Sequence, residues 1–218
     1  MKRDIVGAAV AAWSRRVGRF VAAAPLTYAW LTALLVTTLL GHAMPAARLH
    51  ALLASDSTNL HHLARDPERV LLTSLFWIDG RYWWPYLLLF SAILAPAERW
   101  LGWWRWLTVG LVAHVLATYL SEAYLYWTIA EAQASPRLID ARDIGVSYFL
   151  VGVAGALTYR IPRPWQWIYL GAIAALATAA LIARPDFTQL GHLCALLIGL
   201  GCYPVVRSRL DRPPPPAA

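Results

Sequence analysis

Charged residues are scarce in this chain. They make up 14% of its 218 residues, whereas hydrophobic residues make up 59%. A soluble globular domain carries about 25% charged residues, so the composition argues against a soluble protein. Cysteine is scarce too, because Cys194 and Cys202 are the only two. They stand eight apart in one predicted helix, roughly 12 Å along its axis, which is too far for a disulfide.

Recognisable cofactor and nucleic-acid motifs are also missing. The sequence has no phosphate-binding loop, zinc motif or nucleic-acid-binding module, and its net charge of +7 has to be interpreted loop by loop against a membrane. His61 and His62 could suggest a metal, but adjacent residues point to different sides of a helix, which favours a solvated loop. His114 lies within an apolar run without a partner at the same depth, so we expect a hydrogen-bonded packing histidine rather than a heme ligand. We therefore predict no metal, no cofactor and no nucleic-acid partner.

Long apolar runs, by contrast, recur along the whole chain, and each approaches the roughly 20 residues that a membrane-spanning helix needs. They predict an all-α polytopic membrane protein with a six-helix transmembrane bundle, whose spans are residues 25–40, 82–97, 106–126, 144–159, 165–183 and 190–206. The polar segment 46–71 predicts an extramembrane loop with short interfacial helices. The predicted organisation is a basic N-terminal segment (1–24), one membrane domain (25–206) and a proline-rich tail (207–218).

The distribution of charge predicts the orientation of these spans. Lys and Arg are concentrated in the N-terminal segment, the second and fourth connections and the tail, whereas Asp and Glu are concentrated in the other loops. Basic residues favour the cytoplasmic side, so both termini are expected in the cytoplasm. Glu98, at the cytoplasmic end of the second span, is expected to be a structural acid.

Ser147 and His192 stand out because each interrupts the start of an apolar span. In the predicted topology, the fourth and sixth spans both begin on the outer side, and the two residues lie roughly 5 Å or somewhat more below that interface. Small residues on both spans favour close packing of the two helices. They are Gly145, Gly152 and Gly155 in the fourth span and Gly191, Ala195 and Gly199 in the sixth.

A serine and a histidine that meet inside a membrane have a specific chemical use. A neutral imidazole can take the proton of a serine hydroxyl near pH 7 and so turn it into a nucleophile. The alternative is that Ser147 bonds to a carbonyl of its own helix and His192 bonds to a neighbour, both as packing contacts. The matched depth of the pair favours a functional site.

The residues around this pair resemble those of a known family. Gly145-Val146-Ser147 looks like the G-x-S motif of the rhomboid intramembrane serine proteases, and Gly191-His192 is similar to their histidine followed by small residues. The stretches RVLLTSLF (69–76) and AERWLG (97–102) are similar to family stretches at the second helix. The stretches GVSYFLVGVAG and LGHLCALLIGLGCYP look closest to a divergent bacterial rhomboid-like branch.

The resemblance implies an intramembrane serine protease of the bacterial plasma membrane that cleaves transmembrane substrates. Ser147 would be the nucleophile and His192 the general base. Family proteases draw oxyanion donors from the second helix, and counting back from Glu98 puts Tyr82 and Tyr86 at those positions. A phenol can donate in this role. We favour Tyr86, because Tyr82 fits the aromatic belt at the membrane interface equally well.

A second reading of the same resemblance stays open. A non-catalytic rhomboid-like protein would bind client membrane helices or act as a subunit of a membrane complex. In either case the expected partners are a transmembrane helix, as substrate or client, and the lipid bilayer. The sequence predicts no oligomeric state.

Overall fold

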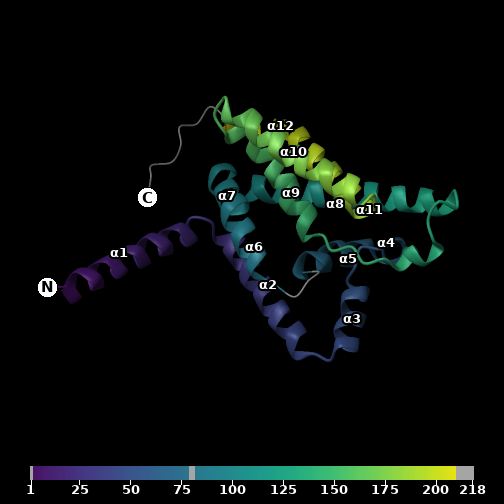
Figure 1. Ribbon diagram of the computed structural model, residues 1–218, viewed down its shortest axis with the longest axis horizontal. Coiled ribbons are helices and arrows are strands. Elements are labelled where there is room, and N and C mark those ends of the chain that lie inside the picture. Colours follow the sequence, from purple (N-terminus) through teal and green to yellow (C-terminus); the bar gives the residue numbers. More distant parts are fainter. Residues whose placement is uncertain (1, 79–81, 210–218) are drawn as a thin grey trace.

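The computed structural model describes residues 2–78 and 82–209, and every regular element within these ranges is helical (Figure 1). The all-α prediction is therefore confirmed. In chain order the elements are α1 (Lys2–Ala22), α2 (Pro25–Ala43), α3 (Ala46–Ser55), α4 (Leu60–Arg65), α5 (Pro67–Thr73), η1 (Ser74–Phe76), α6 (Trp84–Leu89), η2 (Phe90–Leu94), α7 (Ala95–Leu101), α8 (Trp103–Ala130), η3 (Pro136–Asp140), α9 (Val146–Leu157), η4 (Thr158–Arg160), α10 (Trp165–Ala183), α11 (Phe187–Gly201), α12 (Tyr203–Val206) and η5 (Arg207–Arg209).

The apolar helices make this a multi-pass membrane protein. Three of them, α2, α8 and α10, are each long and apolar enough to cross a membrane, and α11 is a shorter apolar helix. The bounds of α10 coincide with the predicted span 165–183. The predicted span 190–206 is instead divided at Cys202 into α11 and α12, because Pro204 lies in the first turn of α12. A count of six spans remains a prediction.

The predicted second span is one helical stretch with a change of pitch inside it. Its pieces are α6, the π-helical turn η2 and α7. The N–H of Ala95 donates to the carbonyl of Phe90, five residues back. Pro96 follows immediately and has no N–H to donate to an α-helical ladder, which accounts for the wider turn at this point. Residues that share a face on one side of η2, at 3.6 residues per turn, therefore do not share it with the residues expected on the other side.

Glycines allow α8, α9 and α11 to pack closely. A Cβ on Gly199 of α11 would overlap the backbone of Gly152 in α9, and a Cβ on Gly155 would press against the carbonyl of Leu196. Gly191 of α11 lies against Tyr148 of α9, as the predicted contact between these helices requires, whereas Gly145 lies against the ring of His114 in α8. Ala195 is fully buried beside Ala117 and Tyr148.

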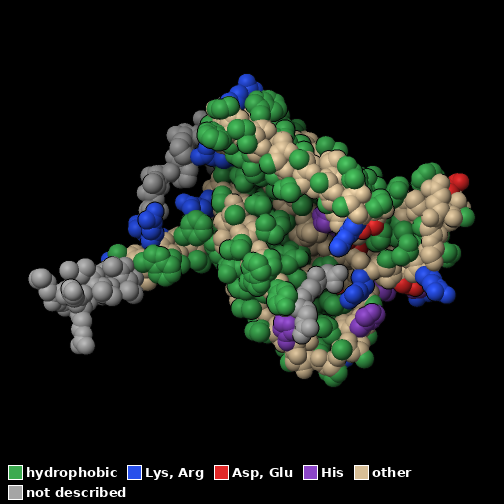
Figure 2. Space-filling view, viewed as in Figure 1, with side chains coloured by type: hydrophobic (Ala, Val, Ile, Leu, Met, Phe, Trp, Pro, Cys, Tyr) green, Lys and Arg blue, Asp and Glu red, His purple; other side chains and the backbone are tan. Residues whose placement is uncertain are grey.

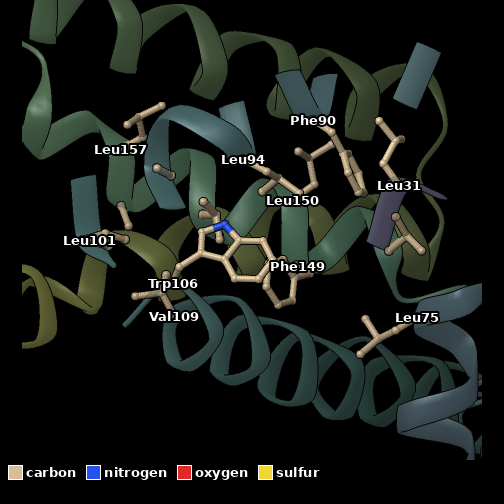
Figure 3. Packing of buried hydrophobic residues seen from close by; sticks show 14 of the residues in the cluster. Leu31, Leu75, Phe90, Leu94, Leu101, Trp106, Val109, Phe149, Leu150 and Leu157 are labelled. Carbon is tan, nitrogen blue, oxygen red and sulfur yellow. The ribbon is translucent and has the colours of Figure 1, made fainter. Parts of the chain in front are cut away.

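An aromatic cluster fills the space between α2, η2, α8 and α9. The ring of Phe149 lies 4.9 Å from that of Trp106 and 4.8 Å from that of Trp30, and Trp30 lies 5.0 Å from Phe90. Figure 3 shows Trp106 and Phe149 side by side, with Phe90, Leu94 and Leu150 near them. The Nε1–H of Trp30 also donates to the carbonyl of Leu75 at 2.8 Å, which ties η1 to the bundle.

The Glu98 side chain caps the N-terminus of α2. Its carboxylate oxygens accept hydrogen bonds from the backbone N–H groups of Leu26 at 3.0 Å and Thr27 at 2.7 Å, and only 4% of Glu98 is exposed. The first N–H groups of a helix have no partner within the helix and carry partial positive charge, so a buried carboxylate there is both hydrogen-bonded and electrostatically favoured. This contact agrees with the structural role predicted for Glu98.

Candidate active site

Ser147 and His192 lie in contact. Ser147 is the second residue of α9, His192 stands in the second turn of α11, and the Ser147 Oγ is 2.9 Å from the His192 Nε2. This contact depends on the close packing of α9 against α11 at Gly152, Gly155 and Gly199, which we call the glycine seam. These glycines let the two backbones approach closely. The serine hydroxyl can donate its hydrogen to the imidazole nitrogen.

Gln189 fixes the other side of the imidazole. Its Oε1 lies 3.3 Å from the His192 Nδ1. An amide oxygen can only accept, so this contact favours the tautomer with hydrogen on Nδ1 and a lone pair on Nε2 facing Ser147. The backbone N–H of Gln189 in turn donates to Asp186, which caps α11. Gln189 was not predicted from the sequence, although its position three residues before His192 on one helix was a usable signal.

Tyr148 packs against the ring of His192 rather than against the neighbouring Ser147 side chain. Its ring is fully buried and meets the His192 ring edge to face, with centroids 5.2 Å apart. Its hydroxyl lies 3.5 Å from both the Ser121 Oγ and the Thr188 carbonyl oxygen. A side chain on Gly191 would overlap this phenol. The residue after the serine thus restricts tilting of the imidazole.

The backbone just before α9 is held by a buried turn of the segment between α3 and α4. The N–H of Asp143 donates to the Ser57 Oγ at 2.6 Å, and the Asp143 carbonyl accepts from the Thr58 N–H at 3.1 Å. The hydroxyl groups of Ser57 and Thr58 donate to the same carbonyl. These bonds set where α9 begins and hence where Ser147 stands. No local sequence signal connects residues 57 and 143.

Asp56 anchors that turn from its other side. Its carboxylate accepts a hydrogen bond from the indole N–H of Trp77 at 2.9 Å and forms an ion pair with Arg69 at 3.2 Å. Asn59 caps α4 by accepting from the N–H of His62. The run from Asp56 to Asn59 therefore joins α3, α4 and α5 to the beginning of α9.

A small cavity opens beside the serine. Its volume is about 140 Å³, and it is lined by Tyr86, Arg142, Asp143, Ile144, Ser147 and Thr188. Tyr86 is therefore close to Ser147, whereas Tyr82 precedes α6 and is 66% exposed. The backbone N–H of Ser147 belongs to the first turn of α9, where N–H groups lack helical partners and favour negative charge. Arg142 is a further potential donor that the sequence analysis did not identify.

A second cavity, with a mostly apolar lining, reaches His192. Its volume is about 290 Å³, and its walls come from α6, η2, α9, α10 and α11. The polar residues on it are Gln189 and His192, and its apolar lining is Leu89, Ile93, Leu150, Val151, Ala154, Ile173, Leu176, Ala177, Ala180 and Leu196. An apolar segment in this cavity would lie against His192.

The remaining histidines considered in the sequence have packing contacts. The Nε2 of His114 lies 2.9 Å from the carbonyl oxygen of Leu71, which links α8 to α5. The rings of His61 and His62 meet edge to face at 5.5 Å. Among the residues that the structure describes, no group of three or more His, Cys, Asp or Glu is arranged to hold a metal ion.

Comparison with known proteins agrees with the resemblance noted in the sequence. Residues 19–212 match the family of rhomboid-like proteins. No curated protein and no solved structure matches the chain. The family match includes the whole helical bundle, with both Ser147 and His192, and on this basis the chain belongs to the rhomboid-like protein family.

Proposed function

We propose that this protein is an intramembrane serine protease that cleaves transmembrane substrates with Ser147 as nucleophile and His192 as general base. The 2.9 Å contact between Ser147 Oγ and His192 Nε2 carries this proposal. Gln189 on Nδ1 and Tyr148 on the ring face support it, because they hold the imidazole in one orientation and favour one tautomer.

The proposed reaction has two halves. Ser147 Oγ attacks the scissile carbonyl as its proton moves to His192 Nε2, and a tetrahedral oxyanion forms. His192 then gives that proton to the leaving amine, which departs and leaves an acyl group on Ser147. Water attacks this ester with His192 again as base, and the new carboxylate leaves with regeneration of the serine hydroxyl.

The oxyanion needs donors that are already in place. The backbone N–H of Ser147 is the first, and Tyr86 and Arg142 line the same small cavity. Losing one donor from such a hole typically costs about a hundred- to a thousandfold in rate. We assign the second donor to Tyr86, with Arg142 as a further candidate, and give Tyr82 no role in the reaction.

The apolar cavity between η2 and α10 supports entry of the substrate from the lipid. Its lining suits a hydrophobic segment, and it leads to Gln189 and His192. The proposal includes six spans within residues 25–206, the N-terminal segment 1–24 and the tail 207–218, with both termini in the cytoplasm of a bacterial cell. In the tail, residues 210–218 lie outside the described structure.

Labelling with a fluorophosphonate probe tests the proposal. Purified protein should be labelled, Ser147→Ala and His192→Ala should not, and Tyr86→Phe should be labelled at least about a hundredfold more slowly. Unchanged labelling of Tyr86→Phe would move the oxyanion donor to another residue. Absence of labelling in folded wild-type protein would overturn the enzymatic proposal.

A non-catalytic role in binding client membrane helices is the second candidate. The observation that favours it is the small volume of the cavity beside Ser147, about 140 Å³, next to a larger apolar cavity that could hold part of a helix. This candidate predicts that Ser147→Ala retains capture of a client transmembrane segment and that no probe reacts with the wild type.

A further inference from the structure

The N-terminal helix α1 has a distinct apolar stripe. Trp13, Val17 and Phe20 recur at the i, i+4, i+7 spacing that places residues on one face of a helix. In the sequence, Val6 and Val10 continue the same spacing toward the N-terminus. Trp13 is 68% exposed, and Val17 and Phe20 are exposed as well, so most of this stripe is not covered by the bundle.

The opposite side of α1 is basic. Arg15, Arg16 and Arg19 are all exposed. Around the helix axis, Arg15 and Arg19 lie roughly 120° or more from the middle of the apolar stripe, and Arg16 lies roughly 70° from it, at the edge of the basic side. The sequence of the helix adds Lys2 and Arg3 and has one acidic residue, Asp4. An exposed helix with aromatic and aliphatic residues on one side and arginines on the other is typical of segments that lie in a membrane interface.

Contacts at the end of α1 place it at the level of that interface. Two residues join it to the membrane helix α2, and the ring of Phe20 meets that of Tyr28 in α2 at 6.2 Å. The guanidinium of Arg99, near the end of α7, lies 5.4 Å from the Phe20 ring centroid. The apolar stripe therefore faces the bundle where α1 ends, and Figure 1 shows the rest of the helix extending away from the bundle.

Arginine and tryptophan are also paired at the same end of the bundle. Arg105 lies over the ring of Trp104 at the start of α8, and Arg163 lies near that of Trp167 at the start of α10. Such residues are enriched at the boundary between hydrocarbon and headgroups. Hydrophobic side chains cover much of the bundle surface next to this end in Figure 2.

We infer that α1 is an interfacial helix that binds the anionic lipid surface of the membrane spanned by its own bundle. The stripe of Trp13, Val17 and Phe20 lies among the upper acyl chains, and Arg15, Arg16 and Arg19 face the phosphate groups. The partner is assigned from charge, since a cluster of arginines with exposed apolar side chains complements an anionic headgroup layer over hydrocarbon. This inference does not depend on any activity of Ser147.

Spin labels on the full-length protein test the inference. Labels are placed at Val17→Cys on the stripe and Ala12→Cys on the other side, in a background with Cys194→Ala and Cys202→Ala, and the protein is reconstituted into phosphatidylcholine vesicles with or without phosphatidylglycerol. With phosphatidylglycerol, we expect the Val17 label to be accessible to oxygen roughly 5–10 Å below the headgroups and the Ala12 label to be accessible to aqueous nickel chelate. Gel filtration before reconstitution checks that the background protein is folded.

A charge variant sharpens the test. Each basic residue near an anionic surface strengthens binding roughly fivefold, so Arg15→Gln, Arg16→Gln and Arg19→Gln together should weaken insertion about a hundredfold and shift the Val17 label toward water. The matched control is Arg48→Gln in α3, Arg65→Gln in α4 and Arg137→Gln in η3, which removes the same charge from exposed positions outside α1 and should leave the label in place.

Three results would overturn the inference. One is a Val17 label as exposed to aqueous reagent as the Ala12 label in phosphatidylglycerol vesicles, which would indicate a helix in water available to a protein partner. The second is an unchanged label depth in the α1 charge variant. The third is an equal shift in the loop control, which would indicate an effect of net charge alone.

Discussion

Two helices that follow each other in the sequence, α9 and α10, are held in opposite ways. Ten of the residues of α9 are buried, and its glycines contact the backbone or side chains of α8 and α11. None of the 19 residues of α10 is buried. A hydrogen bond from the Tyr169 hydroxyl to the Ala154 carbonyl at 2.9 Å joins α10 to α9.

This difference separates two requirements of the proposed site. A proton transfer between Ser147 and His192 needs a fixed distance, and the tightly packed seam of α9 and α11 provides it. A transmembrane substrate needs a route from the lipid, and α10, which has no buried residue, forms one wall of the cavity beside His192. Variants on the two helices should therefore have different effects.

Filling the seam should have the largest effect. Gly199→Leu would force a side chain into the backbone of Gly152, so we expect a loss of about 3 kcal/mol or more in the free energy of unfolding. Gly171→Leu on α10 is the matched control, because a Cβ at Gly171 meets nothing within 4 Å. Unfolding in a titration of denaturing detergent measures both. Similar losses in the two variants would contradict the comparison.

Removing the Gln189 amide, which orients His192, should have the second largest effect. Gln189→Ala leaves the packing of α9 against α11 intact but removes the acceptor at Nδ1 of His192. We expect the rate of labelling by the fluorophosphonate to fall about 10- to 100-fold. Gln189→Glu keeps an acceptor and should recover most of that loss, whereas Leu197→Ala on an exposed face of α11 should behave as wild type. A purely structural role would show equal rates for Gln189→Ala and Gln189→Glu.

Narrowing the lipid-side cavity should have a smaller and selective effect. Ala177→Trp on α10 adds a large side chain to the wall of the cavity and should slow cleavage of a transmembrane substrate about tenfold. The reason is that the substrate would be held out of position relative to Ser147. Labelling by a small fluorophosphonate should be unchanged. Ala179→Trp, on the exposed side of the same helix, should change neither rate. Equal slowing of both assays would indicate damage to the dyad instead.

The smallest effect is expected from Tyr148→Phe. The variant retains the ring against His192 and removes a hydroxyl that lies 3.5 Å from both Ser121 and Thr188 and also interacts with the Asp143 side chain. Hydrogen bonds of 3.5 Å contribute little, and one further hydrogen bond contributes about 1 kcal/mol, so the free energy of unfolding should fall by about 1 kcal/mol. Thermal unfolding in detergent measures this. A loss as large as that of Gly199→Leu would show that the phenol hydroxyl, rather than the ring, holds the seam.

Much of the bundle could be predicted because membrane helices have a simple sequence signature. Apolar length gave the bounds of α10 as the structure has them, and the positions of Ser147 and His192 on their helices indicated that they could meet. Glu98, at the end of the second predicted span, was expected to be a structural acid, and its carboxylate accepts from the first N–H groups of α2. Each of these inferences depends on periodicity or burial within one helix.

Contacts between distant segments could not be predicted in this way. A helical wheel says which residues share a face, but not that Ser57 bonds to Asp143 or that the Tyr148 ring turns toward His192. Counting from Glu98 back to Tyr82 also passes through η2, where the pitch changes and Tyr82 falls outside α6. Tyr86, which the family resemblance favoured, does line the cavity beside Ser147.

The carboxylate of Glu98 also has a consequence for the order of events during synthesis. Glu98 accepts hydrogen bonds from the N–H groups of Leu26 and Thr27, which are synthesised 72 and 71 residues earlier. At about 5–20 residues per second, α2 exists for roughly 4 to 14 seconds before Glu98 is added to the chain. During that interval the start of the first membrane helix depends on water or headgroups for its hydrogen bonds. The N-terminus of the first apolar span therefore receives its hydrogen-bond acceptor only after the second span has been synthesised.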